Sequence, residues 1–110
     1  MPTSYKVLGQ SAPSANTATT LYTVPADTQA VVSTLVVANR VATSSSFRIA
    51  IRPAGATLSN QHYLAYDVAV GAADSTTLTI GVTLAATDVI TVYASSANLT
   101  FNVFGSEITS

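Results

Sequence analysis

Charged residues are scarce in this chain of 110 residues. Only 8% of the residues are Asp, Glu, Lys or Arg, against about 25% in ordinary soluble domains, while 48% are hydrophobic and the mean hydropathy is +0.43. A free domain with so few charges must cover its surface with Thr, Ser, Ala and Val, and a net charge near zero favours association. We therefore expect much of the surface to contact other protein. The alternative is a solitary soluble domain with a Thr- and Ser-rich exterior.

Cysteine is absent, and four Lys and Arg residues stand against five Asp and Glu residues. Without cysteine there is no disulfide framework and no thiolate metal site, which suits a reducing cytoplasm. Without a cationic stripe to neutralise phosphates, nucleic-acid binding is not expected. Apolar runs such as Leu35 to Ala38 are much shorter than the roughly 20 residues of a membrane-spanning helix. No apolar signal segment follows Lys6, so neither a membrane partner nor export by the usual route is expected.

Two-residue alternation and β-branched residues dominate from Thr17 onward. In residues 47–52, three apolar side chains alternate with polar or small ones, which puts Arg48 and Arg52 on the outward face of a half-buried strand. Residues 30–39 are apolar on both parities, as in a central strand or one whose outer face is covered. These patterns predict a sheet protein and no long helix.

Further strands complete the prediction. Residues 78–84 alternate Leu78, Ile80, Val82 and Leu84 with small residues, and Gly81 is a point where the strand bends or bulges. Other strands are expected near Leu21 to Val24, Gln61 to Val70, Val89 to Ala94 and Asn98 to Phe104, with turn residues between them. Seven or eight short strands without crossover helices predict an all-β fold, an antiparallel β-sandwich that is jelly-roll-like.

The chain is long enough for one core, so a single sandwich domain is predicted over residues 17–110. Residues 1–16 are rich in Ser, Ala and Pro and have no sustained period. We interpret them as an N-terminal arm that lies on a neighbour or is left loose.

His62 is the single histidine. A metal site needs three or four converging ligands, and no second His or Cys exists to complete one, so a structural or interface role is favoured over a ligand role. If the surrounding segment is a strand, His62, Leu64 and Tyr66 share one face, and Tyr63 and Asp67 share the other.

Catalytic constellations are not found. Asp27, Asp74 and Asp88 each fall in a predicted turn, where Asx side chains cap backbone N–H groups, and this reading is favoured over paired-carboxylate chemistry. The glycines are scattered singly and form no phosphate-binding loop. We expect neither an enzyme nor a cofactor.

Tyrosine and arginine residues give the candidate interface. Tyr63 and Tyr66 beside His62 could bind a sugar or a neighbouring protein, or could pack in the core with their hydroxyls at its rim. Arg48 and Arg52 lie on an outward face, where they could clamp a partner's carboxylates.

An internal role for the two arginines is the competing interpretation. In that case Arg48 and Arg52 would pair with Asp67 or Glu107 of the same chain. Both interpretations remain open from the sequence.

Several segments in order resemble small structural proteins of tailed-bacteriophage virions, especially those of cyanobacterial and marine phages. The segments are Leu21 to Pro25, Ala30 to Arg40, Ile51 to Pro53, Asn60 to Asp67, Asp88 to Ala94, Leu99 to Phe101 and Phe104 to Ile108. The resemblance covers most of residues 17–108. It implies a non-catalytic accessory or decoration protein of the particle, and it does not distinguish the capsid, neck, tail or fibre base.

Two functions therefore compete. The first is a virion subunit that packs against other virion proteins and forms a homo-oligomer, made and assembled in the bacterial host cytoplasm. The second is a carbohydrate- or host-surface-binding module of a phage fibre, with Asn60, His62, Tyr63 and Tyr66 as its site. A bacterial surface or pilus-type module is a third reading, disfavoured by the missing export signal.

Overall fold

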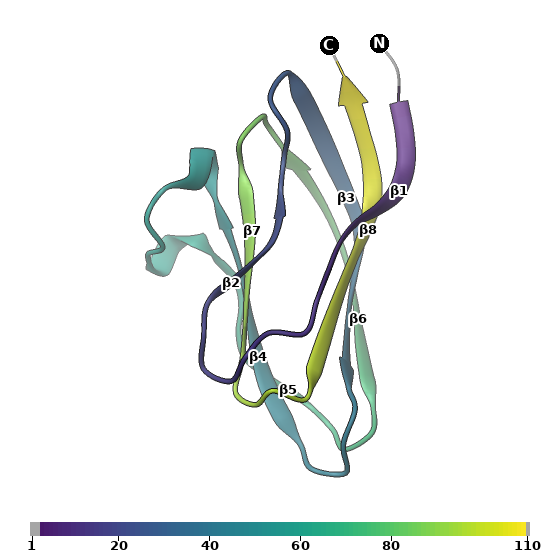
Figure 1. Ribbon diagram of the computed structural model, residues 1–110, viewed down its shortest axis with the longest axis vertical. Coiled ribbons are helices and arrows are strands. Elements are labelled where there is room, and N and C mark those ends of the chain that lie inside the picture. Colours follow the sequence, from purple (N-terminus) through teal and green to yellow (C-terminus); the bar gives the residue numbers. More distant parts are fainter. Residues whose placement is uncertain (1–2, 110) are drawn as a thin grey trace.

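The computed structural model describes residues 3–109, apart from the side chain of Ile80, as two β-sheets packed face to face (Figure 1). The strands are β1 (Thr3–Ser11), β2 (Thr19–Thr23), β3 (Thr28–Asn39), β4 (Ser45–Arg52), β5 (Tyr63–Val70), β6 (Ser75–Leu84), β7 (Val89–Ala94) and β8 (Leu99–Thr109). Two short 3-10 turns, η1 (Pro53–Gly55) and η2 (Asn60–His62), lie between β4 and β5. Within the described residues, no helix is both long and apolar enough to cross a bilayer.

The strands pair in a nested order. β1 pairs with β8, β2 with β7, β3 with β6 and β4 with β5, all antiparallel, as in one long hairpin folded back on itself. Pairing of β3 with β8 and of β4 with β7 closes the sheets β1-β8-β3-β6 and β2-β7-β4-β5. Eight strands in two such sheets form a jelly roll. The predicted all-β antiparallel sandwich is confirmed.

The core lies between the two sheets and follows the alternation of the sequence. In β4, Phe47 and Ile49 are buried inward, whereas Arg48 points outward. The ring of Phe47 meets that of Phe101 from the opposite sheet edge to face, with centroids 6.2 Å apart. Such aromatic pairs add to the stabilisation from buried area, so this contact fixes how the two sheets face each other.

β3 is a central strand, as its two-sided apolar pattern predicts. Its inward residues are Ala30, Val32, Leu35, Val37 and Asn39, so the inward parity changes between residues 32 and 35. The pairing with both neighbouring strands shifts register at the same place. This irregularity moves the inward positions from even to odd residue numbers. In addition, Val31 and Val36 are apolar residues on the outward side of the strand.

The opposing part of β6 carries the predicted bend. The partners of β3 skip from Thr79 to Val82, and Gly81 adopts a φ of +56°, which L side chains rarely adopt. Leu78 and Leu84 face the core as expected. The expectation for the Ile80 side chain falls outside the described residues.

The N-terminal segment differs from the expected arm. Residues 3–11 form β1, an edge strand that pairs along β8 from Thr3 with Ile108 to Ser11 with Phe101. A β-carbon on Gly9 would lie only 2.3 Å from the carbonyl oxygen of Leu21, so β1 and β2 approach closely because this position has no side chain. The Ser- and Ala-rich composition did not reveal the strand because β1 is mostly exposed and has little apolar periodicity.

The predicted Asx turns are confirmed for two of the three aspartates. The Asp74 carboxylate accepts the backbone N–H of Ser75, and that of Asp88 accepts those of Ala85 and Ala54. Asp27 lies in the turn between β2 and β3 with a φ of +56°. The carboxylates of Asp74 and Asp88 therefore stabilise turns.

A carboxylate joins the two sheets at one end of the sandwich. Glu107 of β8 has a side chain only 12% exposed, forms an ion pair of 2.7 Å with Lys6 of β1, and accepts a hydrogen bond from the hydroxyl of Tyr22 in β2. The hydrogen bond with Lys6, followed by that with Tyr22, lowers the pKa of Glu107. Burial, followed by the bond to Glu107, raises the pKa of Tyr22 well above its usual range.

This contact predicts a specific acid sensitivity. Because the folded-state pKa of Glu107 is lowered, its stabilisation is complete above the unfolded-state pKa of about 4.3 and is lost as pH falls through the folded value. Glu107→Gln should lower the free energy of unfolding at pH 7 by about 1–3 kcal/mol, and the difference from wild type should shrink below about pH 4. Urea unfolding at both pH values measures this, and an equal difference at pH 3 and pH 7 would contradict it.

Candidate interaction site

The outer face of the β2-β7-β4-β5 sheet carries an arginine–tyrosine cluster of Arg48, Tyr63, Tyr66, Asp67 and Tyr93. The guanidinium carbon of Arg48 lies 4.1 Å from the ring centroid of Tyr66 and 4.4 Å from that of Tyr93. Its Nε donates to Asp67 at 2.7 Å. That hydrogen bond raises the pKa of Arg48. Of the predicted roles, the structure gives Arg48 the internal pairing with Asp67.

The tyrosine rings of the cluster meet, although the sequence places Tyr63 and Tyr66 on opposite strand faces. Their centroids are 4.9 Å apart and the rings are nearly perpendicular. β5 has more residues than β4 over the paired region, with register shifts on both sides of Ala65, and Asp67 adopts a φ of +53°. These irregularities break the two-residue alternation on which the prediction depended, so the predicted face assignment is wrong.

The cluster borders a pocket of about 290 Å³. Tyr63, Tyr93 and Arg48 contribute polar and aromatic groups to its wall, and Ala50 is a small lining residue. The Tyr93 hydroxyl donates to the Asn16 side chain at 2.8 Å, which connects the β1–β2 loop to the pocket. Aromatic surface with a few convergent polar groups is typical of small-ligand sites, and this volume is near the lower limit of about 300 Å³ for them.

Arg52 and His62 have a different role from the cluster. Arg52 donates to Thr91 at 2.9 Å and to the carbonyl of Ala56 at 3.2 Å. His62 is in η2 rather than in the strand, and its Nδ1 accepts the backbone N–H of Ser59. Both side chains therefore hold the segment between β4 and β5, which protrudes beside its sheet in Figure 1.

The outer face of the other sheet is chemically the opposite. The four strands β1, β8, β3 and β6 contain only two charged residues, Lys6 and Glu107, which pair with each other. We call the outward side of this sheet the uncharged face. Its outward side chains include Tyr5, Val7, Val31, Ser33, Thr34, Val36, Thr77, Thr79, Thr83, Asn102, Phe104 and Ser106.

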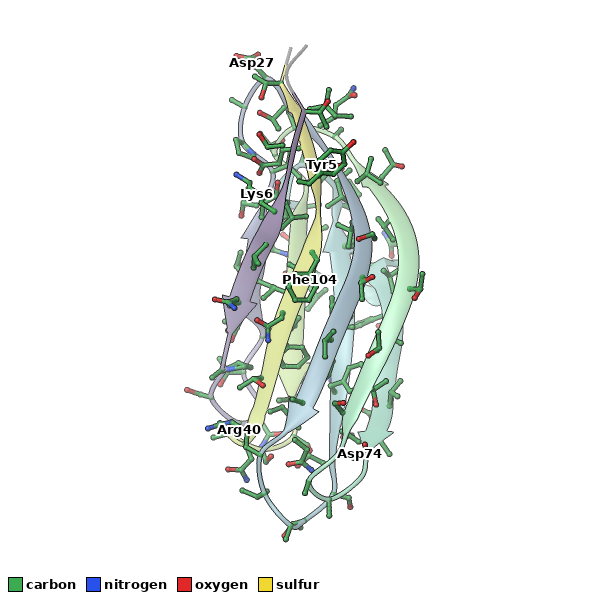
Figure 2. All side chains as sticks on the ribbon, turned by 90° about the vertical axis from the view of Figure 1, so that its right-hand side faces the viewer. Tyr5, Lys6, Asp27, Arg40, Asp74 and Phe104 are labelled. Carbon is green, nitrogen blue, oxygen red and sulfur yellow. The ribbon has the colours of Figure 1, made fainter. Side chains whose placement is uncertain are left out.

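The uncharged face is seen directly in Figure 2. Phe104 lies near its middle, Lys6 at the side formed by β1, and Asp27, Arg40 and Asp74 at its two ends. A shallow groove of about 590 Å³ runs beside Phe104, between Val7 and Val31. Tyr5 borders the groove and is 84% exposed. The face thus combines an exposed aromatic side chain with an apolar depression.

Sequence reasoning missed Tyr93, Tyr5 and Phe104. The side chain of Tyr93 points outward from β7, a strand that the sequence predicts. The alternation along this strand could therefore have placed Tyr93 on the outer face. Tyr5 and Phe104 share a face only because β1 joins the sheet through β8, which composition did not indicate. No protein-family model, curated protein sequence or solved structure matches the chain.

These two surfaces offer aromatic rings, a guanidinium and hydroxyl groups for non-covalent contacts. Among the described residues, no group of three or more His, Cys, Asp and Glu side chains is placed to hold a metal ion. The ion pair of Arg48 with Asp67 and its two ring contacts hold the cluster in one arrangement.

The stacked arginine predicts a spectroscopic signature. The guanidinium of Arg48 lies over two aromatic rings, so the side-chain protons of Arg48 should resonate upfield of those of Arg40, whose guanidinium donates to the backbone carbonyls of Ala97 and Asn98. Tyr66→Leu and Tyr93→Leu should each move the Arg48 signals part of the way back. Proton NMR of the folded chain tests this, and Arg48 signals that coincide with those of Arg40 in wild type would contradict the contact.

Proposed function

We propose that this chain is a non-catalytic structural subunit of a tailed-bacteriophage virion, a capsid decoration or cement protein or a neck or tail accessory protein. It acts through protein–protein packing with other virion proteins, and is made and assembled in the host cytoplasm. The observation that carries the proposal is the uncharged face, because the four strands contain one ion pair, of Lys6 with Glu107, and the other side chains that they present are uncharged. Such a surface is suited to burial against another protein.

Two further features support a packing role. The titratable side chains of Asp74, Asp88 and His62 accept hydrogen bonds from nearby backbone N–H groups, so they stabilise the local backbone. The jelly-roll topology is one that viral capsid proteins use, although it is equally used by lectins, so this support is analogy at the level of the fold. The resemblance in sequence to virion proteins points in the same direction.

The virion role predicts that the chain purifies with particles. Mass spectrometry of gradient-purified phage that encodes it should detect many copies per particle. Val36→Lys, which places a charge on the uncharged face, should deplete the chain from particles by tenfold or more, because a buried unpaired charge is costly. The Leu64→Lys variant, which places the charge on β5 of the other sheet, should remain in the particles at the wild-type level. Wild-type chain found only outside the particles would contradict the proposal.

A carbohydrate-binding module is the second candidate, and the pocket beside the arginine–tyrosine cluster favours it. Tyr63 and Tyr93 offer ring faces to a sugar, while Asn16, Arg48 and Thr91 supply polar groups in a pocket of about 290 Å³. This set differs from the Asn60, His62, Tyr63 and Tyr66 site that the sequence suggests, since His62 is engaged with Ser59.

The glycan candidate predicts binding that depends on the pocket. A glycan array should give a specific signal, and Tyr63→Ala should weaken it at least tenfold because the ring lines the pocket. Tyr5→Ala, on the other sheet, should leave the signal unchanged. A signal equally affected by both variants, or no signal, would contradict this candidate.

A further inference from the structure

We propose that the occupant of the uncharged face is a second copy of this chain, so that two β1-β8-β3-β6 sheets stack face to face. The inference deepens the packing role proposed above and rests on it, but not on the virion location. The uncharged face is then the interface of a symmetric dimer, and Tyr5 is an anchor residue of that interface.

The first argument is area. The four strands have nine to twelve residues each. With about 4.8 Å between strands and about 3.3 Å per residue, the face measures on the order of 600 Å² in projection. A standard protein interface buries roughly 800 Å² of accessible surface on each partner, and a pleated sheet with side chains has more accessible surface than its projection. The face is therefore large enough for a stable dimer.

The second argument is charge. A partner of complementary charge has nothing to recognise here, because Lys6 and Glu107 satisfy each other and the other charged residues in Figure 2 lie at the ends. Two identical surfaces that carry no charge meet without like-charge repulsion, as in this case. A closed pair of copies also needs a patch that is complementary to itself.

The third argument is shape. Tyr5 projects beside a groove of about 590 Å³ that is lined by Val7, Val31 and Phe104. A two-fold arrangement lets Tyr5 of each copy enter the groove of the other. Tyrosine is enriched among interface anchors, because its ring buries a large area and its hydroxyl finds a polar partner, for which Ser33 and Ser106 line the same groove.

The opposite sheet is less suited to a second copy. The segment from η1 to η2 protrudes on that side, held by Arg52 and His62. The surface also presents the ion pair of Arg48 and Asp67, whose carboxylate is half-exposed. Stacking there would bury charges and collide with the protruding segment.

Sedimentation equilibrium of the full chain tests the pair. Wild type should dimerise, and Tyr5→Lys should raise the dissociation constant by roughly 30-fold or more, as for other anchor residues. Leu64→Lys is the matched control, since Leu64 is 51% exposed on the other sheet and should leave the constant unchanged. Wild type that remains monomeric at all concentrations, or a dimer weakened by Leu64→Lys and not by Tyr5→Lys, overturns the inference.

A thiol introduced into the cysteine-free chain identifies the buried face. The alkylation rate of the Ser33→Cys variant should fall as protein concentration rises through the dissociation constant, because Ser33 is exposed on β3 within the uncharged face. The alkylation rate of the Ala69→Cys variant should not change, because Ala69 is exposed on β5 of the other sheet. Equal protection of both thiols, or of neither, overturns the stacking arrangement.

The two proposals fail separately. A chain that is present in particles but monomeric in solution, with Ser33→Cys protected only in particles, overturns the second copy as occupant and leaves the virion role standing. A stacked dimer that is absent from particles supports the inference and contradicts the virion role.

Discussion

The scarcity of charge constrains every other feature of this molecule. Nine charged side chains must serve 110 residues, and the fold places them at turns, at strand edges and in two ion pairs. Asp74 and Asp88 cap turns, Lys6 with Glu107 secures the β1 edge, and Arg48 with Asp67 secures β5. No charge remains for the outer face of the β1-β8-β3-β6 sheet. Its solvation depends on the short hydroxyls of Thr and Ser, which hold water less strongly than ionic groups.

The pairing order explains how so short a chain builds a closed core. Each strand pairs with a partner equally far from the middle of the chain, so β4 with β5 form the local hairpin and β1 with β8 the most distant pair. The sheets then meet through inward residues such as Phe47 and Phe101. Glu107 adds a polar connection, because Lys6 and Tyr22 reach it from different sheets. The pairing of β1 with β8 therefore depends on contacts between residues about a hundred positions apart, and folding should be governed by non-local contacts.

Sequence alternation was sufficient for the fold class and for the inward face of β4, because burial on one side leaves a period of two. It was insufficient where the period is broken. The register shifts of β5 brought Tyr63 and Tyr66 together against the predicted alternation, and the turn η2 removed His62 from the strand. The exposed edge strand β1 left no apolar signal and was taken for an arm. The pairing of Arg48 was among the alternatives, but the choice of Asp67 over Glu107 needed the strand order, which alternation does not encode.

The two sides of the sandwich are unlike, and this gives each subunit a direction. One side is a plain sheet of hydroxyl and aliphatic groups, and the other carries the protruding β4–β5 segment above Arg52 and Thr91. When two copies stack through their plain sides, the pocket sides of both copies lie on the outside of the pair. Whatever the tyrosine-lined pocket holds would then be bound on both outer sides of the pair, and two weak contacts made together act as one stronger attachment.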